Sequence, residues 1–131
     1  MKIVRWRYVL FEVISGDVGQ EELISIIWRQ IYSLFGVFKG ANSGFKLLQF
    51  DKDKKIGIAR INWRFIDEFR VVLATLNMQK EGLLVNEILV SGTLAALKRK
   101  MMERKTWREL NKDIMENEKL SMEVNKHDGD L

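Results

Sequence analysis

Two places in the sequence have residue types and spacing that suit a chemical role. Asp51 and Asp53 form a closely spaced carboxylate pair, as general acid–base catalysis requires, but three lysines lie among and beside them. Such a polar segment is also typical of a hairpin turn, in which Asp side chains accept hydrogen bonds from the backbone. We therefore predict a turn here and no catalytic pair.

The second place is the glycine-rich segment Gly40–Lys46. A nucleotide phosphate loop needs the spacing G-x-x-x-x-G-K-[ST], whereas here Phe45 separates Gly44 from Lys46. The segment therefore predicts a loop that needs backbone freedom, whose amides and lysine remain able to hold an RNA phosphate. The chain has no cysteine and one histidine, His127, so we expect no catalytic residue, no metal site and no cofactor bound by the protein itself.

Charge is distributed unevenly along the 131 residues, which carry 22 Lys+Arg and 18 Asp+Glu. Residues 1–97 have 13 basic and 10 acidic side chains, 98–108 have six and one, and 109–131 have three and seven. A basic block between a folded body and an acidic tail favours a polyanionic partner, although a solvated charged helix explains the same block. The apolar fraction of 47% supports a core, and the sequence contains neither a membrane-length apolar run nor a signal-peptide pattern. We expect a soluble, cytoplasmic protein with no membrane partner.

Hydrophobic periodicity predicts the elements that must position these side chains. Runs rich in aromatic and β-branched residues predict strands, and apolar residues three and four apart predict helices. The first expected elements are a strand over 5–14, a helix over 19–35 with Asp17 as its N-cap, and a flexible loop containing Gly36, Gly40 and Gly44. Strands over 45–50 and 56–61 follow, and then a helix that begins after Asn62 and ends at Gly82. The last expected elements are a strand over 83–91 and helices after Thr93 and from Thr106.

This β-α-β-β-α-β order with right-handed crossovers predicts a ferredoxin-like α/β sandwich, an α+β fold with an antiparallel four-stranded sheet, plus C-terminal helices. We place the ferredoxin-like core at residues 1–92, C-terminal helices that are first basic and then acidic at 93–118, and a flexible tail at 119–131. The strand over 5–14 is apolar on both faces, and two helices cover only one face of such a sheet. We therefore expect the C-terminal helices or another chain to cover the other face.

In this topology, the start of the first strand, the loop before the second and the ends of the third and fourth all lie at one end of the sheet. Basic residues from these segments should gather there and bind a nucleic-acid backbone. The strand over 56–61 has no aromatic residue, so base stacking on that strand is not expected. The candidate contacts, among which Lys46 and Arg60 are preferred, are Arg5, Arg7, Lys39, Lys46, Arg60, Arg64, Lys98, Arg99 and Lys100.

An ordered set of short segments resembles a known family. The segments are Arg7–Glu12, Ile27–Trp28, Leu34–Gly36, Ala41–Lys46, Phe50–Asp51, Arg60–Asn62, Arg70–Ala74 and Val90–Thr93. Together they resemble the archaeal ribonuclease P protein component 2 family, also called the Pop-five family, over roughly residues 5–100. No segment is diagnostic alone, but the order of the set is specific.

The resemblance implies an accessory subunit of the ribonucleoprotein that removes the 5′ leader from precursor tRNA. In that family the RNA subunit performs the Mg²⁺-dependent hydrolysis, and the protein is not catalytic alone. The implied partners are the ribonuclease P RNA, precursor tRNA within the holoenzyme, and protein component 3, a TIM-barrel-like protein. The resemblance also leaves open a homodimer at the centre of a heterotetramer.

Two other functions are compatible with the residues. One is a protein–protein scaffold of a ribonucleoprotein, whose basic end is merely solvated; salt-independent behaviour without RNA retention would favour it. The other is a small enzyme that uses the Asp51 and Asp53 pair or the glycine loop on a phosphorylated substrate. Activity of the purified protein without RNA would identify that enzyme.

Overall fold

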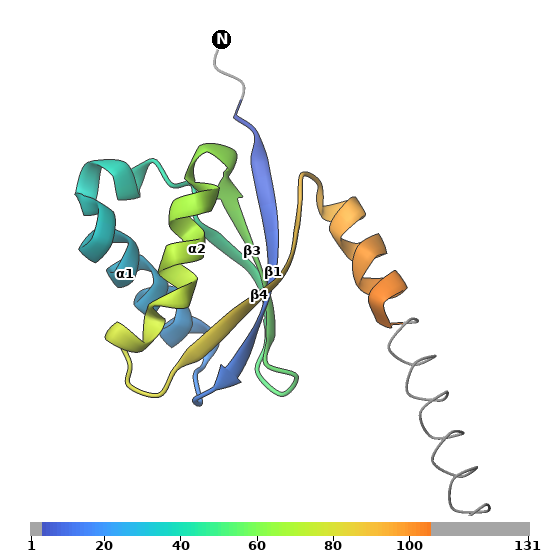
Figure 1. Ribbon diagram of the computed structural model, residues 1–131, viewed down its shortest axis with the longest axis horizontal. Coiled ribbons are helices and arrows are strands. Elements are labelled where there is room, and N and C mark those ends of the chain that lie inside the picture. The colour runs from blue at the N-terminus through green and yellow to red at the C-terminus, as the bar shows by residue number, and fades with distance from the viewer. Residues whose placement is uncertain (1–3, 106–131) are drawn as a thin grey trace, which may run out of the picture. The chain divides into compact units, whose positions relative to one another are not determined.

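The structure, a computed structural model, describes residues 4–105 (Figure 1). Its strands are β1 (Trp6–Ser15), β2 (Lys46–Asp51), β3 (Ile56–Asn62) and β4 (Leu84–Ser91), and its helices are α1 (Gln20–Ala41), α2 (Ile66–Ala74), 3-10 turns at Trp63–Phe65 and Leu76–Met78, and a helix over residues 94–105. The chain divides into two compact units, one up to Leu97 and one from Lys98 onward. No helix within residues 4–105 is both long and apolar enough to cross a bilayer.

The four strands form one antiparallel sheet in the order β2-β3-β1-β4. Helices α1 and α2 lie on the same face of this sheet (Figure 1). This arrangement confirms the predicted ferredoxin-like α+β fold. Each edge strand carries one extra residue at a bulge, Leu48 in β2 and Ile88 in β4, where the pairing register shifts.

The core lies between the sheet and the two helices. Alternate residues of each strand point into it because side chains of a strand alternate between its two faces. On β1 these are Val9, Phe11 and Val13, and the neighbouring positions Tyr8 and Leu10 therefore face away from the helices. The helices and β3 contribute Leu23, Ile27, Ile31, Ala59, Ile61, Phe69, Val72 and Leu73. On the opposite face, Leu10 and Ile58 pair across β1 and β3 and are each only 4% exposed, so part of that face is also covered.

Helix α1 differs from its prediction at both ends. It begins after Gly19, which makes no side-chain cap hydrogen bond, so the expected Asp17 cap is wrong. It also continues to Ala41, through a segment that was expected to be a loop. Gly36 departs from the helix with φ 79° and ψ 172°, a combination that glycine alone tolerates, after which the helix resumes for one turn. The glycine was correctly identified as a break, but it kinks the helix instead of ending it.

The helix over residues 94–105 begins where the sequence predicts. The Thr93 hydroxyl oxygen accepts a hydrogen bond from the Ala96 backbone amide at 3.1 Å and so caps the first turn. Leu97 is fully buried, and the second unit begins at the next residue. The helix expected from Thr106 and the tail expected over 119–131 lie outside the described residues.

Candidate nucleic-acid interface

Strand pairing brings the predicted basic residues to one end of the sheet. Trp6 pairs with Asn62, and the backbone amide of Trp63 donates to the carbonyl of Arg5 at 2.9 Å, which places the start of β1 beside the end of β3. The loop before β2 joins them through a hydrogen bond from the Asn62 amide to the Ser43 carbonyl at 2.8 Å. We call this region the basic end, and the candidate residues that lie there are Arg5, Arg7, Lys39, Lys46, Arg60 and Arg64.

A cross-strand row on the face away from the helices carries the two preferred cations. Lys46 of β2 is directly opposite Arg60 of β3, and Arg60 is opposite Tyr8 of β1. Directly opposite residues point to the same face, with Cβ atoms about 5 Å apart. Lys46 is exposed and Arg60 half-buried. The two positive residues are therefore neighbours on one face of the sheet.

Arg60 is held in place by an aromatic ring. Its guanidinium carbon lies 3.9 Å from the centroid of the Trp6 ring, a close cation–π stack. The Trp6 ring in turn lies over Gly44, where an added Cβ would come within 2.7 Å of a ring carbon. The Arg60 Nε atom is buried and has no hydrogen-bond partner within the described residues. Stacking thus orients the Arg60 guanidinium group, whose Nε donor has no partner within the described residues.

The other four cations of the basic end have different surroundings. Arg7 is half-buried and donates from its guanidinium to the Trp6 carbonyl at 3.1 Å. Arg5 is exposed. Arg64 lies 5.5 Å from the centroid of its neighbour Trp63, and its backbone amide donates to the Asn62 side chain, confirming that Asn62 caps the turn.

Lys39 forms an ion pair with Glu68, with 3.0 Å between its Nζ atom and the carboxylate oxygen, which joins the last turn of α1 to α2. A hydrogen bond from the backbone amide of Glu68 lowers the pKa of this carboxyl group, and Lys39 lowers it further, against the opposing effect of burial. Because its charge is already matched, Lys39 is less available to a phosphate than Lys46 or Arg60.

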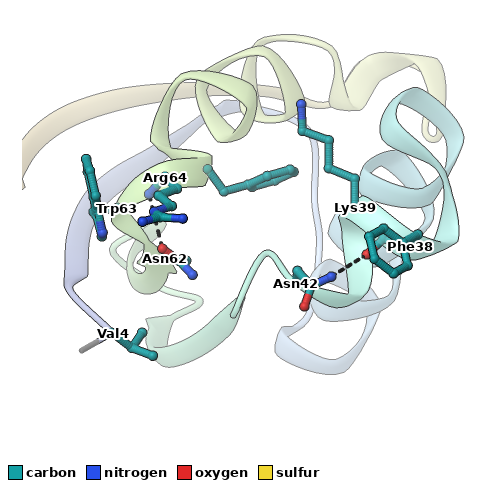
Figure 2. Close-up of a pocket in the computed structure, with 8 residues that line it drawn as sticks. Val4, Phe38, Lys39, Asn42, Asn62, Trp63 and Arg64 are labelled. Atoms are coloured by element: carbon teal, nitrogen blue, oxygen red, sulfur yellow. Dashed lines mark hydrogen bonds between the residues drawn. The ribbon is translucent and has the colours of Figure 1, made fainter. Parts of the chain in front are cut away.

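A cavity of about 630 Å³ opens at the basic end, within the first compact unit (Figure 2). In the close-up, Trp63, Arg64 and Asn62 lie on one side of the space, and Phe38, Lys39 and Asn42 lie on the other. The lining residues are Val4, Phe38, Lys39, Asn42, Asn62, Trp63, Arg64 and Phe65. This cavity lies within the usual size range of ligand sites.

The remaining candidates, Lys98, Arg99 and Lys100, lie on the helix of the second unit, where all three are exposed. Their contact with RNA stays a prediction.

Several carboxylates lie at the opposite end of the sheet, and lysines pair with two of them. Lys80 donates to a Glu22 carboxylate oxygen at 2.6 Å, and Lys52 lies 3.9 Å from Asp17. The Asp51 carboxylate accepts hydrogen bonds from the backbone amides of residues 53 and 54, which confirms the predicted turn. No three His, Cys, Asp or Glu residues gather into a potential metal site within residues 4–105.

Sequence reasoning did not identify the partners of the basic residues. The guanidinium carbons of Arg60 and Arg64 lie 3.9 Å and 5.5 Å from the ring centroids of Trp6 and Trp63. The sequence around Phe38 contains no motif that would predict its place at the cavity. Arg60 and Trp63 are close in sequence at the end of β3, and this spacing was the available signal that aromatic rings accompany the cations. The stack of Arg60 on Trp6 depends instead on the register between β1 and β3.

Comparison with known proteins gives consistent similarities. A family model described as the Rpp14/Pop5 family matches residues 7–102. Ribonuclease P protein component 2 of Pyrococcus horikoshii is 31% identical over 104 residues, which cover 78% of this chain and 87% of the relative. The protein of the same name from Pyrococcus abyssi is 30% identical over 105 residues, which cover 78% and 88%. A chain in the cryo-EM structure of yeast ribonuclease MRP has the same fold, with a TM-score of 0.58 and 19% identity over 84% of this chain and 98% of that chain.

Proposed function

Because the chain belongs to the Rpp14/Pop5 family, we propose that it is a protein subunit of ribonuclease P, the ribonucleoprotein that removes the 5′ leader from precursor tRNA. The family agrees with the resemblance detected in the sequence. The observation that best supports the proposal is that Lys46 and Arg60 lie opposite each other on paired strands, with Arg60 stacked on Trp6.

The basic end would act on the RNA by neutralising phosphates. Each phosphate contact releases condensed counterions, so affinity falls steeply as salt rises. Lys46 supplies an exposed ammonium group, and Arg60 supplies a guanidinium group that is oriented by stacking and has an unused donor at Nε. Together they lower the cost of packing RNA phosphates where the RNA assembles its catalytic Mg²⁺ ions. In this proposal the protein binds no cofactor and the RNA performs the hydrolysis.

The partners in this proposal are the ribonuclease P RNA, protein component 3, and precursor tRNA within the holoenzyme, with a second copy of this chain at the centre of the assembly. Exposed apolar side chains support protein contacts, because Ile14 and Leu84 lie at the paired ends of β1 and β4. We place this assembly in the cytoplasm.

Reconstituted cleavage tests the role of the basic end. Precursor tRNA is incubated with a ribonuclease P RNA, with and without this protein and component 3, at low Mg²⁺ across a salt series. We expect stimulation that needs both proteins. We expect Lys46→Ala and Arg60→Ala each to weaken RNA association and to reduce the salt slope by about 1, because each removes one phosphate contact.

Lys54→Ala is the matched control, because it removes an exposed lysine from the turn at the opposite end of the sheet. It should leave cleavage and its salt dependence unchanged. Stimulation that survives both basic-end substitutions would place the protein as a scaffold without direct RNA contact. Lack of stimulation by the folded wild-type proteins with a competent RNA would contradict the subunit assignment itself.

A further inference from the structure

The cavity between Phe38 and Trp63 is distinct from the row of Lys46 and Arg60. Its walls come from the last turn of α1 and from the segment that joins β3 to α2 (Figure 2). Aromatic side chains stand at both sides of the opening, with Phe38 85% and Trp63 38% exposed. Val37, beside Phe38, is exposed as well. Rings presented this openly at the rim of a cavity provide flat surfaces for a planar ligand.

Hydrogen bonds fix the backbone of the two turns that carry the rings. The kink at Gly36 sets the direction of the last turn of α1, and the Asn42 side-chain amide donates to the Phe38 carbonyl at 2.9 Å, which closes that turn. On the other side, the Trp63 amide is bonded to Arg5 and the Asn62 side chain caps the turn that carries Trp63. Because the backbone of both turns is already ordered, a ligand that stacks on the rings needs to order only their side chains.

The polar groups of the cavity suit a base and its phosphate. Asn42 uses its NH₂ group and Asn62 its carbonyl oxygen in the hydrogen bonds named above, so within the described residues one amide retains an acceptor and the other a donor. Arg64, at the rim, forms no ion pair within residues 4–105. The opening therefore combines stacking surfaces, a hydrogen-bond donor and acceptor, and an unmatched positive charge.

We infer that this cavity binds an unpaired base of an RNA strand, stacked on Phe38 on the side that faces Trp63, with Arg64 on the adjacent phosphate. The inference rests on the proposed RNA-binding function and adds a second, base-contacting site to it. Single-stranded nucleic acids are held by this combination of aromatic stacking and cationic groups. An apolar peptide could use the rings and pair its backbone with the amides, but it would leave Arg64 without an anionic partner, so the chemistry favours RNA.

The test compares two labelled RNAs that have the same phosphates. Binding of the full-length protein to a short oligouridylate and to its abasic counterpart is measured by fluorescence anisotropy at low salt. We expect the wild type to prefer the oligouridylate by about tenfold, in line with the usual contribution of one stacked base. Phe38→Ala and Phe38→Leu should both abolish this preference, since leucine retains apolar contact but cannot stack.

Val71→Ala is the control, because it removes an exposed apolar side chain from α2 that does not line the cavity. It should keep the wild-type preference. The proposal is overturned if the wild type shows no preference, or if the Phe38 variants keep it. If Phe38→Ala instead weakens association with component 3 while the RNA preference persists, the cavity is a protein-docking site. Failure of the base site is separable from failure of the proposed function, because the Lys46 and Arg60 substitutions would still reduce reconstituted cleavage.

Discussion

Arg60 shows how single residues cooperate to build the interface. An exposed arginine samples many rotamers, and each phosphate contact then requires ordering of its long side chain. Here the Trp6 ring, 3.9 Å from the guanidinium carbon, orders the side chain in the absence of any ligand. The ring can lie there because position 44 has no Cβ. A glycine in the loop therefore determines how an arginine on β3 is presented.

Substituting Gly44 should disturb both the fold and the interface. Gly44 has φ +68°, and a Cβ there would come within 2.7 Å of the Trp6 ring. We expect Gly44→Ala to lower the free energy of unfolding by about 2–4 kcal/mol, the sum of backbone strain and displacement of the ring. Urea denaturation measures this cost, and RNA affinity should fall with it.

Gly82→Ala separates the two causes. Gly82 has a similar φ of +83°, but an added Cβ would meet no atom within 4 Å. Gly82→Ala should therefore lower the free energy of unfolding by about 1 kcal/mol, through backbone strain alone, and leave RNA affinity unchanged. Equal losses in both variants would show that the contact with Trp6 contributes nothing.

At the scale of elements, the Lys39–Glu68 ion pair connects the last turn of α1 to α2. Glu68 lies in the first turn of α2, where free backbone amides favour a negative charge. Its own backbone amide lowers the pKa of Glu68, and Lys39 adds to the effect. This pair also limits the movement of the α1 turn that carries Phe38.

Removing the Glu68 charge should give a pH-dependent loss of stability. A carboxyl group whose pKa is lower in the folded state stabilises the protein above its unfolded-state pKa, and that contribution disappears as pH falls through the folded-state pKa. We therefore expect Glu68→Gln to cost about 0.5 kcal/mol at pH 7, because a partly exposed pair contributes no more than that, and close to nothing at a pH low enough to protonate Glu68 in the folded state. Urea unfolding at the two pH values measures the difference.

Glu81→Gln is the reference, because Glu81 is an exposed carboxylate that forms no ion pair within residues 4–105. It should change stability little at either pH. A Glu68→Gln cost that stays constant with pH would instead indicate lost packing.

At the scale of the first compact unit, charge is polarised along the strands. Arg5, Arg60 and Lys46 lie at one end, whereas lysines offset carboxylates at the other, as in the Lys80–Glu22 and Lys52–Asp17 pairs. A polyanion therefore attracts one end of this body more strongly than the other, within roughly one Debye length. Orientation during approach depends on where the charges lie and less on their sum.

Two variants with the same net charge test this polarity. Lys46→Glu and Lys54→Glu each change the charge by two units, at opposite ends of the sheet. We expect the first to slow association with ribonuclease P RNA about tenfold and the second to have a much smaller effect, because steering depends on the end that meets the RNA. Stopped-flow association rates at low and high salt provide the measurement. Equal effects would mean that only net charge matters.

The order of elements was predictable from sequence because periodicity and turn chemistry act locally. Runs rich in aromatic and β-branched residues predict the strands, and the start of a helical segment after Asn62 is predictable because its side chain accepts a hydrogen bond from the amide two residues ahead. The path of α1 beyond Gly36 was not predictable. A glycine break predicts departure from the helix, but only packing against α2 shows that the helix resumes.

The candidate site was predictable in its location but not in its contacts. Topology alone brings Lys46 and Arg60 together, since it fixes which strand ends meet. The stack on Trp6 and the cavity between Phe38 and Trp63 depend on register and on tertiary packing across segments that are distant in the sequence. No local pattern contains that information.

The bulges in the edge strands have a further consequence, which concerns colloidal behaviour. A flat, regular edge offers a row of unpaired amides and carbonyls on which another copy can polymerise. Both outer strands, β2 and β4, are interrupted by an extra residue, and exposed Lys46 stands at the beginning of β2. Open-ended stacking of sheets is thereby disfavoured.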